Sequence, residues 1–239
     1  MTYPTPPAPA ARNEPVPAYP ARLTGMPAAT LSRWLWLVKW VLAIPHYVVL
    51  FFLAIAMIFV TIFAFFAILF TARYPRSLFD FSVGVLRWNW RVAFYSYSAL
   101  GTDVYPPFTL KAGGYPADFE VDYPDRLSRG LVLVKWWLLV IPHLLVVGAL
   151  VGGGWSMATS TGYMGSDGRG FGISLLGALV IIAAVMLLFT GRYARGLFDF
   201  ILGINRWTYR VIAYTALLRD EYPPFRLDQG GVDPGRQTT

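Results

Sequence analysis

The stretch LFTARYPRSLFDFSVGVLRWNWRVAFY, residues 69–95, returns later in the chain as LFTGRYARGLFDFILGINRWTYRVIAY, residues 188–214. Each copy then reaches the tetrapeptide YPPF, which begins at Tyr105 and at Tyr222. Upstream, LSRWLWLVKWVLAIPH ends at His46 and is echoed by RLSRGLVLVKWWLLVIPH, which ends at His143. Because a duplicated unit fixes the domain plan before any secondary structure is assigned, we predict two tandem copies of one module.

The composition indicates that lipid is the main solvent of this chain. Of the 239 residues, 56% are hydrophobic and 14% are charged, and the mean hydropathy is +0.50. An ordinary globular domain is less apolar and more charged. The runs 34–70 and 173–189 contain almost no ionisable side chain, and a membrane-spanning helix needs about 20 such residues. We therefore predict an all-α integral membrane protein.

The repeat sets the predicted domain boundaries. The modules are expected at 29–110 and 126–227, joined by a linker at 111–125. Residues 1–28 are rich in Pro and Ala and are expected to form a disordered tail. Residues 228–239 are expected to form a C-terminal tail.

The second copy carries 22 extra residues between its two apolar runs, because the histidines of the copies are 97 positions apart and Arg73 and Arg192 are 119 apart. The insertion is a Gly/Ser/Thr-rich polar loop, 152–172. It predicts a helical hairpin, outward over roughly 127–151 and back over 173–190.

The first copy leaves two possibilities open. Its apolar run either turns tightly near Ala54, or breaks at Pro45 and crosses the membrane once. Because duplicated units share a topology, we favour the hairpin. Each hairpin is then followed by an amphipathic helix in the membrane interface.

Charge distribution predicts the orientation. Four crossings place 17 of the 20 Lys and Arg residues on one side, the exceptions being Lys39, Lys135 and Arg169. Positively charged segments stay on the cytoplasmic side. We therefore expect a multi-pass membrane protein with both termini in the cytoplasm.

Charged residues repeat at equivalent positions in the two amphipathic segments. Asp80, Arg87 and Arg91 have spacings that place them on one helix face. Three interpretations remain open: topology signals, pairing of Asp80 with an arginine of the other repeat, or binding of anionic lipid headgroups by guanidinium groups. The candidate residues are Arg73, Arg76, Asp80, Arg87 and Arg91 in the first copy, and Arg192, Arg195, Asp199, Arg206 and Arg210 in the second.

Four ionisable residues fall inside the apolar first helices: Lys39, His46, Lys135 and His143. Intramembrane ionisable groups suggest function. However, each lysine lies close enough to a helix end to reach the interface, and the Lys-to-His spacing changes from seven to eight between the copies. This change argues against a proton-handling role that depends on a fixed Lys-to-His spacing. The YPPF segments are expected to be structural terminators, and Gly84 and Gly203 to allow close helix packing.

Enzymatic and metal-binding signatures are missing from the sequence. It has no cysteine and none of the motifs GK[ST], HExxH or GxSxG. We therefore predict no catalytic residue, metal or cofactor. The net charge of +7 lies around apolar helices, which favours anionic lipid over nucleic acid as the counter-charge.

The repeated pattern IPH, FTxRYxRxLFDFxxG, RWxxRV and YPPF resembles a bacterial membrane family, common in actinobacteria, that is known only as a domain of unknown function. The resemblance covers nearly everything from Leu31 to Phe225. It implies the module boundaries and a location in the bacterial plasma (inner) membrane, and it names no reaction.

Abundant interfacial anchors beside a lack of reactive groups favour a non-enzymatic accessory or scaffold protein. It would associate with a larger membrane complex, or with copies of itself, and with anionic lipid. The alternative is a lipid-binding or lipid-transport component that grips headgroups with the paired arginines.

Overall fold

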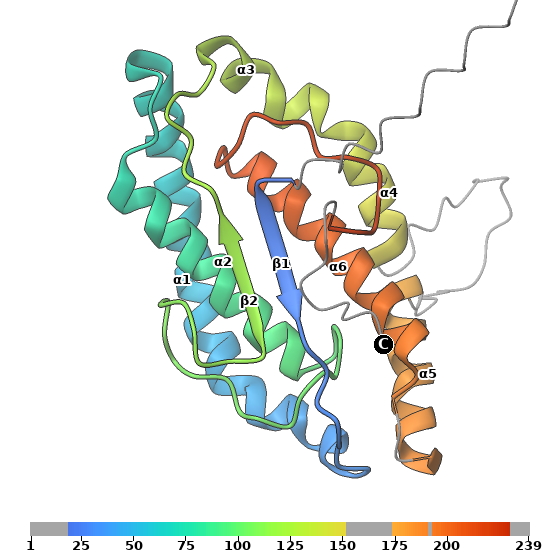
Figure 1. The fold of residues 1–239 in the computed structure, drawn as a ribbon. Helices are drawn as coiled ribbons and strands as arrows, with labels where there is room; N and C mark the ends of the chain where they lie inside the picture. Colours follow the sequence, from blue (N-terminus) through green and yellow to red (C-terminus); the bar gives the residue numbers. More distant parts are fainter. Residues whose placement is uncertain (1–18, 152–173, 191–192, 230–239) are drawn as a thin grey trace, which may run out of the picture.

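The computed structural model describes residues 19–151, 174–190 and 193–229, apart from the side chains of Trp136 and Trp137. The first copy contains strand β1 (Ala21–Gly25), a short 3-10 turn η1 (Leu35–Leu37), helix α1 (Lys39–Thr71) and helix α2 (Arg76–Tyr95), which returns along α1 (Figure 1). Four of the predicted features lie outside the described residues: the tail 1–18, the polar loop 152–172, Arg192 and the tail 230–239.

The second copy repeats this order in more pieces. Strand β2 (Ala117–Val121) leads to α3 (Arg129–Val134), a π-helical segment η2 (Lys135–Leu139), α4 (Ile141–Val151), α5 (Leu175–Thr190) and α6 (Arg195–Thr215). The prediction of a mostly helical fold is confirmed, and a two-stranded sheet is added to it within the described ranges.

The sheet joins the two copies. β1 and β2 pair in antiparallel register, with Leu23 opposite Phe119 at the centre. Tyr-Pro-Ala begins at Tyr19 and again at Tyr115, 96 positions on, which is also the distance from Lys39 to Lys135. Each copy therefore contributes one equivalent strand, and an approximate two-fold axis passes through the centre of the ladder.

These strands correct two predicted boundaries. The tail 1–28 was expected to be disordered and 111–125 to be a linker, yet β1 and β2 lie inside them. The reason is burial: alternate side chains, including Leu23 and Phe119 at 1% exposure each, pack into the main core while the backbones pair with each other. A five-residue strand is too short to reveal itself within a Pro-rich composition.

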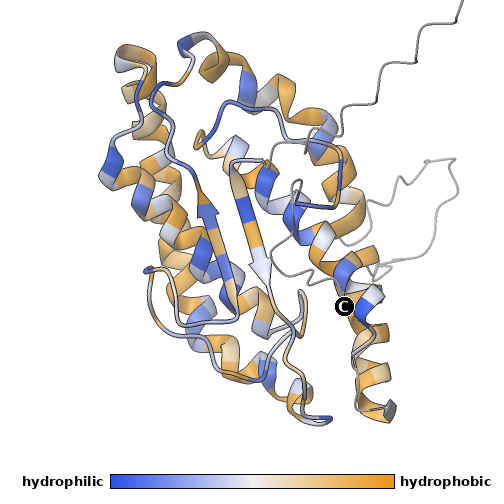
Figure 2. Cartoon of the chain, viewed as in Figure 1, coloured by the Kyte–Doolittle hydropathy of each residue, from blue (hydrophilic) through white to orange (hydrophobic). Residues whose placement is uncertain are grey.

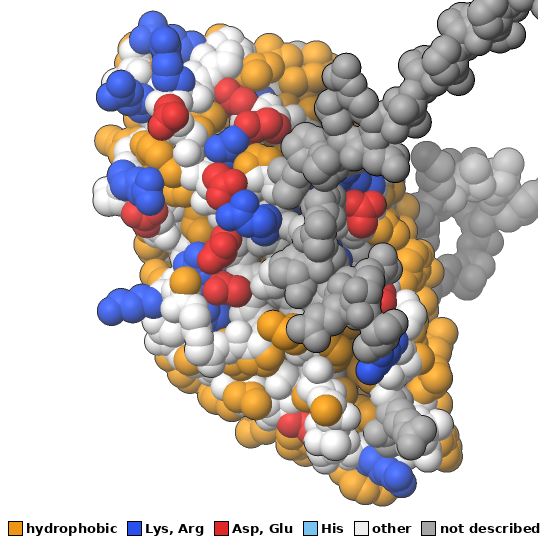
Figure 3. Space-filling model, viewed as in Figure 1, with side chains coloured by type: hydrophobic (Ala, Val, Ile, Leu, Met, Phe, Trp, Pro, Cys, Tyr) orange, Lys and Arg blue, Asp and Glu red, His pale blue; other side chains and the backbone are white. Residues whose placement is uncertain are grey.

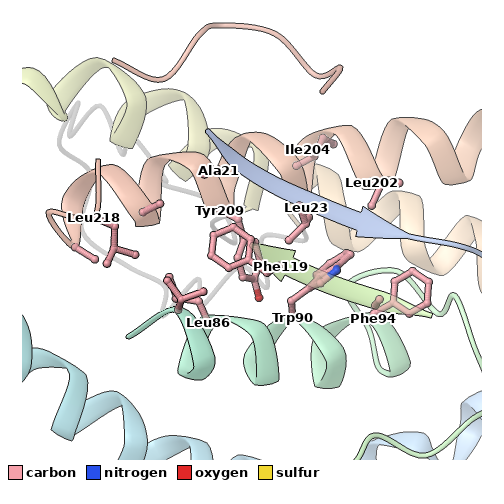
Figure 4. Packing of buried hydrophobic residues seen from close by; sticks show 14 of the residues in the cluster. Ala21, Leu23, Leu86, Trp90, Phe94, Phe119, Leu202, Ile204, Tyr209 and Leu218 are labelled. Atoms are coloured by element: carbon pink, nitrogen blue, oxygen red, sulfur yellow. The ribbon is translucent and has the colours of Figure 1, made fainter. Parts of the chain in front are cut away.

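The elements form layers. β2 packs on α2 and β1 on α6, while α1 packs on α2, and α4 and α5 pack on α6. Figure 4 shows Phe119, Trp90 and Tyr209 meeting between the sheet and the amphipathic helices. The order is therefore sheet, amphipathic helices, apolar helices, so the most apolar segments lie farthest from the sheet.

The predicted hairpin in the first copy is wrong, and so is the predicted break at Pro45. α1 is one helix of 33 residues with Pro45 inside it. No Gly or turn signal interrupts the run, so nothing outweighs continued helical hydrogen bonding. Near the proline, where the helix loses a backbone donor, the hydroxyl of Tyr105 donates to the carbonyl of Leu42 at 3.1 Å.

The second copy is not a hairpin either. Lys135 contacts Tyr214 near the end of α6, and His143 contacts Trp207 farther back along it, so α3 to α4 run antiparallel to α6. α5 reaches α6 through a four-residue connection and packs on it. α4 and α5 therefore follow one another down the same side of the molecule, along the path that α1 takes in the first copy (Figure 1).

The outer helices expose apolar side chains. Among the described residues, α1 is the one helix long and apolar enough to cross a membrane, and only 11% of its most apolar window is buried. Phe52, Phe59 and Phe70 are 64, 67 and 73% exposed, and Phe189 of α5 is 76% exposed. The apolar colouring of α1, α4 and α5 in Figure 2 follows these surfaces.

Candidate functional site: paired lysine, histidine and arginine clusters

Lys39 is anchored at the start of α1 and is 1% exposed. Its Nζ donates to the carbonyl of Thr102 at 2.7 Å and lies 2.9 Å from Oδ1 of Asp103. The ring of Tyr95, at the end of α2, lies 5.0 Å from the ammonium. The lysine is therefore held inside the protein, and the prediction that it snorkels to the interface is wrong.

Lys135 occupies the equivalent place in the second copy and is fully buried. Its Nζ donates to the carbonyl of Arg219, lies 3.0 Å from Oδ1 of Asp220, and sits 4.6 Å from the ring centre of Tyr214. A buried ammonium is costly unless a carboxylate and hydrogen-bond acceptors surround it. Both copies meet this requirement with the same three kinds of group: an aspartate, a backbone carbonyl and a tyrosine ring.

The π-helical segment η2 explains the change in Lys-to-His spacing. It begins at Lys135 and ends four residues before His143. A single π turn accommodates one extra residue within a helix. The eight-residue spacing therefore brings His143 to the same place that seven residues bring His46, so the difference in spacing does not distinguish the two copies.

His46 is fully buried beside the YPPF segment of its own copy. Its ring stacks on Phe108, with centroids 3.9 Å apart, and lies 4.8 Å from the ring of Tyr105. Nε1 of Trp88 donates to Nδ1 of His46 at 3.1 Å. YPPF does more than end the module, since its two aromatic rings cover the histidine.

His143 repeats this arrangement. It stacks on Phe225 at 4.4 Å, contacts Tyr222 at 4.6 Å, and accepts a hydrogen bond from Nε1 of Trp207 at 3.3 Å. Because Nδ1 accepts in both copies, each ring is neutral with its proton on Nε2. Neither Nε2 has a hydrogen-bond partner among the described residues. The contacts hold each histidine as a neutral packing element.

In the first copy the paired arginines face a carboxylate. Arg87 donates through Nε to Oδ1 of Asp118 at 2.7 Å, and Arg91 lies 3.6 Å from the same oxygen. Arg87 also donates to the carbonyl of Leu110 at 3.0 Å. Desolvation lowers the pKa of Arg91, which is fully buried, and Asp118 opposes that shift. Strand β2 thus supplies the anion for α2.

The paired arginines of the second copy lie on α6, which packs on β1. The position of β1 equivalent to Asp118, 96 residues earlier, is Arg22. Arg206 donates to the carbonyl of Leu23 at 3.2 Å, and Arg210 donates to the carbonyls of Arg226 and Asp228. Burial, reinforced by the charge of Arg226, lowers the pKa of Arg210 to about 10. Backbone carbonyls therefore accept hydrogen bonds from both arginines, and the charge of Asp228 opposes the lowering of the Arg210 pKa.

The remaining charged candidates lie at the surface. Asp80 accepts from Nε of Arg76 at 3.3 Å, one turn away on the same helix. The interpretation that Asp80 pairs with an arginine of the other repeat is therefore wrong, because its exposed side chain pairs with Arg76 of the same helix. Arg73, Arg195 and Asp199 are exposed as well.

The two glycines bear out the expectation of close packing, but their partner is not another helix. A Cβ at Gly84 would lie 2.8 Å from Cβ of Leu110, and one at Gly203 would lie 2.8 Å from Cβ of Leu227. The chain that follows each YPPF thus crosses directly over the amphipathic helix.

Several residues of these clusters were missed. Asp103 and Asp220 stand two positions before YPPF in both copies, so the repeated pattern is DxYPPF. That repetition, together with two buried lysines in need of a counter-charge, was a usable signal. Asp118 carried none, because its counterpart in the first copy is Arg22.

The fold and the clusters define a two-copy protein with an apolar helical layer, in which buried cations and aromatic rings join the elements of each copy. The chain matches a domain of unknown function (DUF4389) over residues 33–109 and 170–226, and it belongs to that family. No curated protein and no solved structure matches it significantly.

Proposed function

We propose that this protein is a non-enzymatic accessory or scaffold protein embedded in the bacterial inner membrane, with both termini on the cytoplasmic side. The observation that carries the proposal is the exposed apolar surface of α1. Its most apolar window is only 11% buried, whereas the core helix of a soluble protein is mostly covered. An apolar surface of this extent needs lipid or a partner.

A signal sequence does not account for α1. The strand β1 that precedes it is paired with β2 and buried against α6, and α1 itself packs on α2 through Ala43, His46 and Leu50. Removing α1 would therefore remove part of the fold. This supports a permanent place for the helix in the mature protein.

The use of the ionisable groups supports a non-enzymatic role. Both buried lysines pair with aspartates, both histidines accept from tryptophans, and Arg87 and Arg91 share Asp118. A catalytic acid or base must be free to reach a substrate. The lysines and histidines singled out by the sequence join the elements of each copy, and Arg87 and Arg91 join α2 to β2.

The same contacts weigh against the lipid-gripping alternative. Arg91 and Arg210 are 0% and 1% exposed and face internal acceptors, so a headgroup would have to displace those acceptors. Anionic lipid is better placed at the exposed Arg73, Arg76 and Arg195, where each cation contributes about 1 kcal/mol of attraction near an anionic surface.

Gentle detergent extraction of the full chain, followed by mass spectrometry of co-eluting proteins and lipids, tests this proposal. We expect the chain in the membrane fraction after alkaline washing, together with a stoichiometric membrane-protein partner or a second copy. As a matched control, R87Q/R91Q and R73Q/R76Q are extracted in parallel, and only the second pair should lose anionic lipid. Complete release by alkaline washing contradicts membrane embedding, and purification of a lone chain at every detergent concentration contradicts the accessory role.

A further inference from the structure

We propose that the apolar layer lies flat within one leaflet of the bilayer, with α1 and the α4 to α5 path parallel to the membrane and the sheet facing water. The partner of this layer is then the acyl chains of a single leaflet. The inference rests on the proposed membrane embedding. In this arrangement no helix crosses the membrane, in place of the four crossings predicted from the sequence.

The position of the charged residues along α1 carries the argument. Near its start, His46 contacts Trp88 of α2, and the neighbouring Arg87 pairs with Asp118 of β2. Beyond its end, Tyr74 accepts a hydrogen bond from Tyr123, just after β2. The charged residues between Asp118 and Tyr123 therefore lie alongside the middle of α1.

Those residues are exposed. The side chains of Glu120 and Asp122 are 54 and 51% exposed, and that of Arg22, which pairs with both, is 38% exposed. Figure 3 shows Lys, Arg, Asp and Glu gathered over the sheet and its neighbouring segments, with apolar side chains along the margins. If α1 stood upright across the bilayer, this charged face would lie at the depth of the hydrocarbon, where charged side chains are strongly disfavoured.

The dimensions agree with a flat layer. A helix of 33 residues is about 50 Å long, well beyond a hydrocarbon core of about 30 Å. A helix with its side chains is about 10–12 Å thick, which fits within one leaflet of about 15 Å. A helix parallel to the membrane has no upper limit on its length, so the unbroken α1 needs no turn.

The pseudo-symmetry requires the same orientation for both copies. The antiparallel pairing of β1 and β2 places the two-fold axis across the sheet, and the apolar helices of both copies lie on the far side of α2 and α6 from the sheet. One flat surface therefore serves both copies, whereas upright helices would leave the sheet without an aqueous side.

The test uses single cysteines, because the chain has none of its own. The variants R33C and R73C mark the two ends of α1, E120C marks the sheet, and F59C marks the exposed apolar face. Right-side-out and inside-out membrane vesicles are treated with a membrane-impermeant maleimide. The flat arrangement predicts labelling of R33C, R73C and E120C from one side only, and weak labelling of F59C from either side.

The outcomes separate this inference from the proposed function. Labelling of R33C and R73C from opposite sides would show that α1 crosses, which overturns the flat arrangement and leaves membrane embedding intact. Recovery of all four variants in the soluble fraction would overturn both. Strong labelling of F59C in intact vesicles, with R33C and R73C on one side, would place α1 in water and overturn the leaflet assignment.

Discussion

The first apolar segments of the two copies start from similar sequences and are built differently. In the first copy, α1 runs unbroken from Lys39 to Thr71. In the second, α3, η2, α4 and α5 cover the equivalent path, with a π turn near the start and the insertion 152–172 in the middle. Nevertheless, both paths present a buried lysine and a buried histidine to the same kinds of partner. The contacts, and not the continuity of the helix, are what the repeat preserves.

The largest expected effect concerns the contact between the copies. Trp90 and Tyr209 are equivalent positions, and their rings lie 5.6 Å apart with Trp90 fully buried. W90A should lower the free energy of unfolding by about 3–5 kcal/mol, since it leaves a cavity and removes the donor to the carbonyl of Thr24. Chemical denaturation in mild detergent measures this.

A matched control is W34A, because Trp34 is 67% exposed in the same copy and its loss should cost less than about 0.5 kcal/mol in detergent. If W90A and W34A have equal effects, the copies are not held together through Trp90.

The internal repeat allowed much of this fold to be predicted. The similar segments 69–95 and 188–214 located both amphipathic helices, and the apolar run predicted helix over α1. The hairpins were wrong because hydropathy reports what surrounds a residue, not the direction of the chain, and a polar insertion was taken for a change of direction. The strands were missed because β1 is stable only when paired with β2, nearly 100 residues away.

The site was predicted in part. The structure places Lys39, His46, Lys135 and His143 in buried clusters. Their partners come from distant segments such as DxYPPF, and pairing across the fold leaves little trace in one sequence. Whether the exposed arginines bind lipid stays a prediction.

The next comparison concerns the two buried lysines. K39M and K135M should each lower the free energy of unfolding by about 2–4 kcal/mol, because each leaves an uncompensated carboxylate in a mostly buried position. The double variants K39M/D103L and K135M/D220L should recover a large part of that loss. A pronounced effect in only one copy, measured under the same denaturation conditions, would show that the two lysine sites are not equivalent.

A smaller effect is expected from the π turn. Deleting Leu138, which lies within η2 and is 47% exposed, should restore the seven-residue spacing of the first copy and convert the π turn to α-helix. The expected change is about 1 kcal/mol or less in either direction, because Lys135 and His143 keep their positions.

Deletion of Leu42 in α1 is the matched comparison. It shortens the Lys-to-His spacing to six, rotates His46 by about 100° away from Trp88, and should destabilise far more than the deletion in η2. Equal destabilisation by the two deletions would contradict the view that η2 accommodates one extra residue.

The smallest effect is expected at the surface pair of Arg76 and Asp80, whose side chains are 65 and 58% exposed. An exposed ion pair one helical turn apart contributes about 0.3–0.5 kcal/mol, so D80N should change the free energy of unfolding by no more than that. The same substitution at the equivalent Asp199 should match it, and added salt should remove both differences because mobile ions screen exposed charges. Although the expected effect is small, the measurement also tests whether Asp80 is exposed. If D80N costs several kcal/mol and salt leaves that cost unchanged, Asp80 must be buried against a partner, and the charged end of α2 would belong to an interface with another protein.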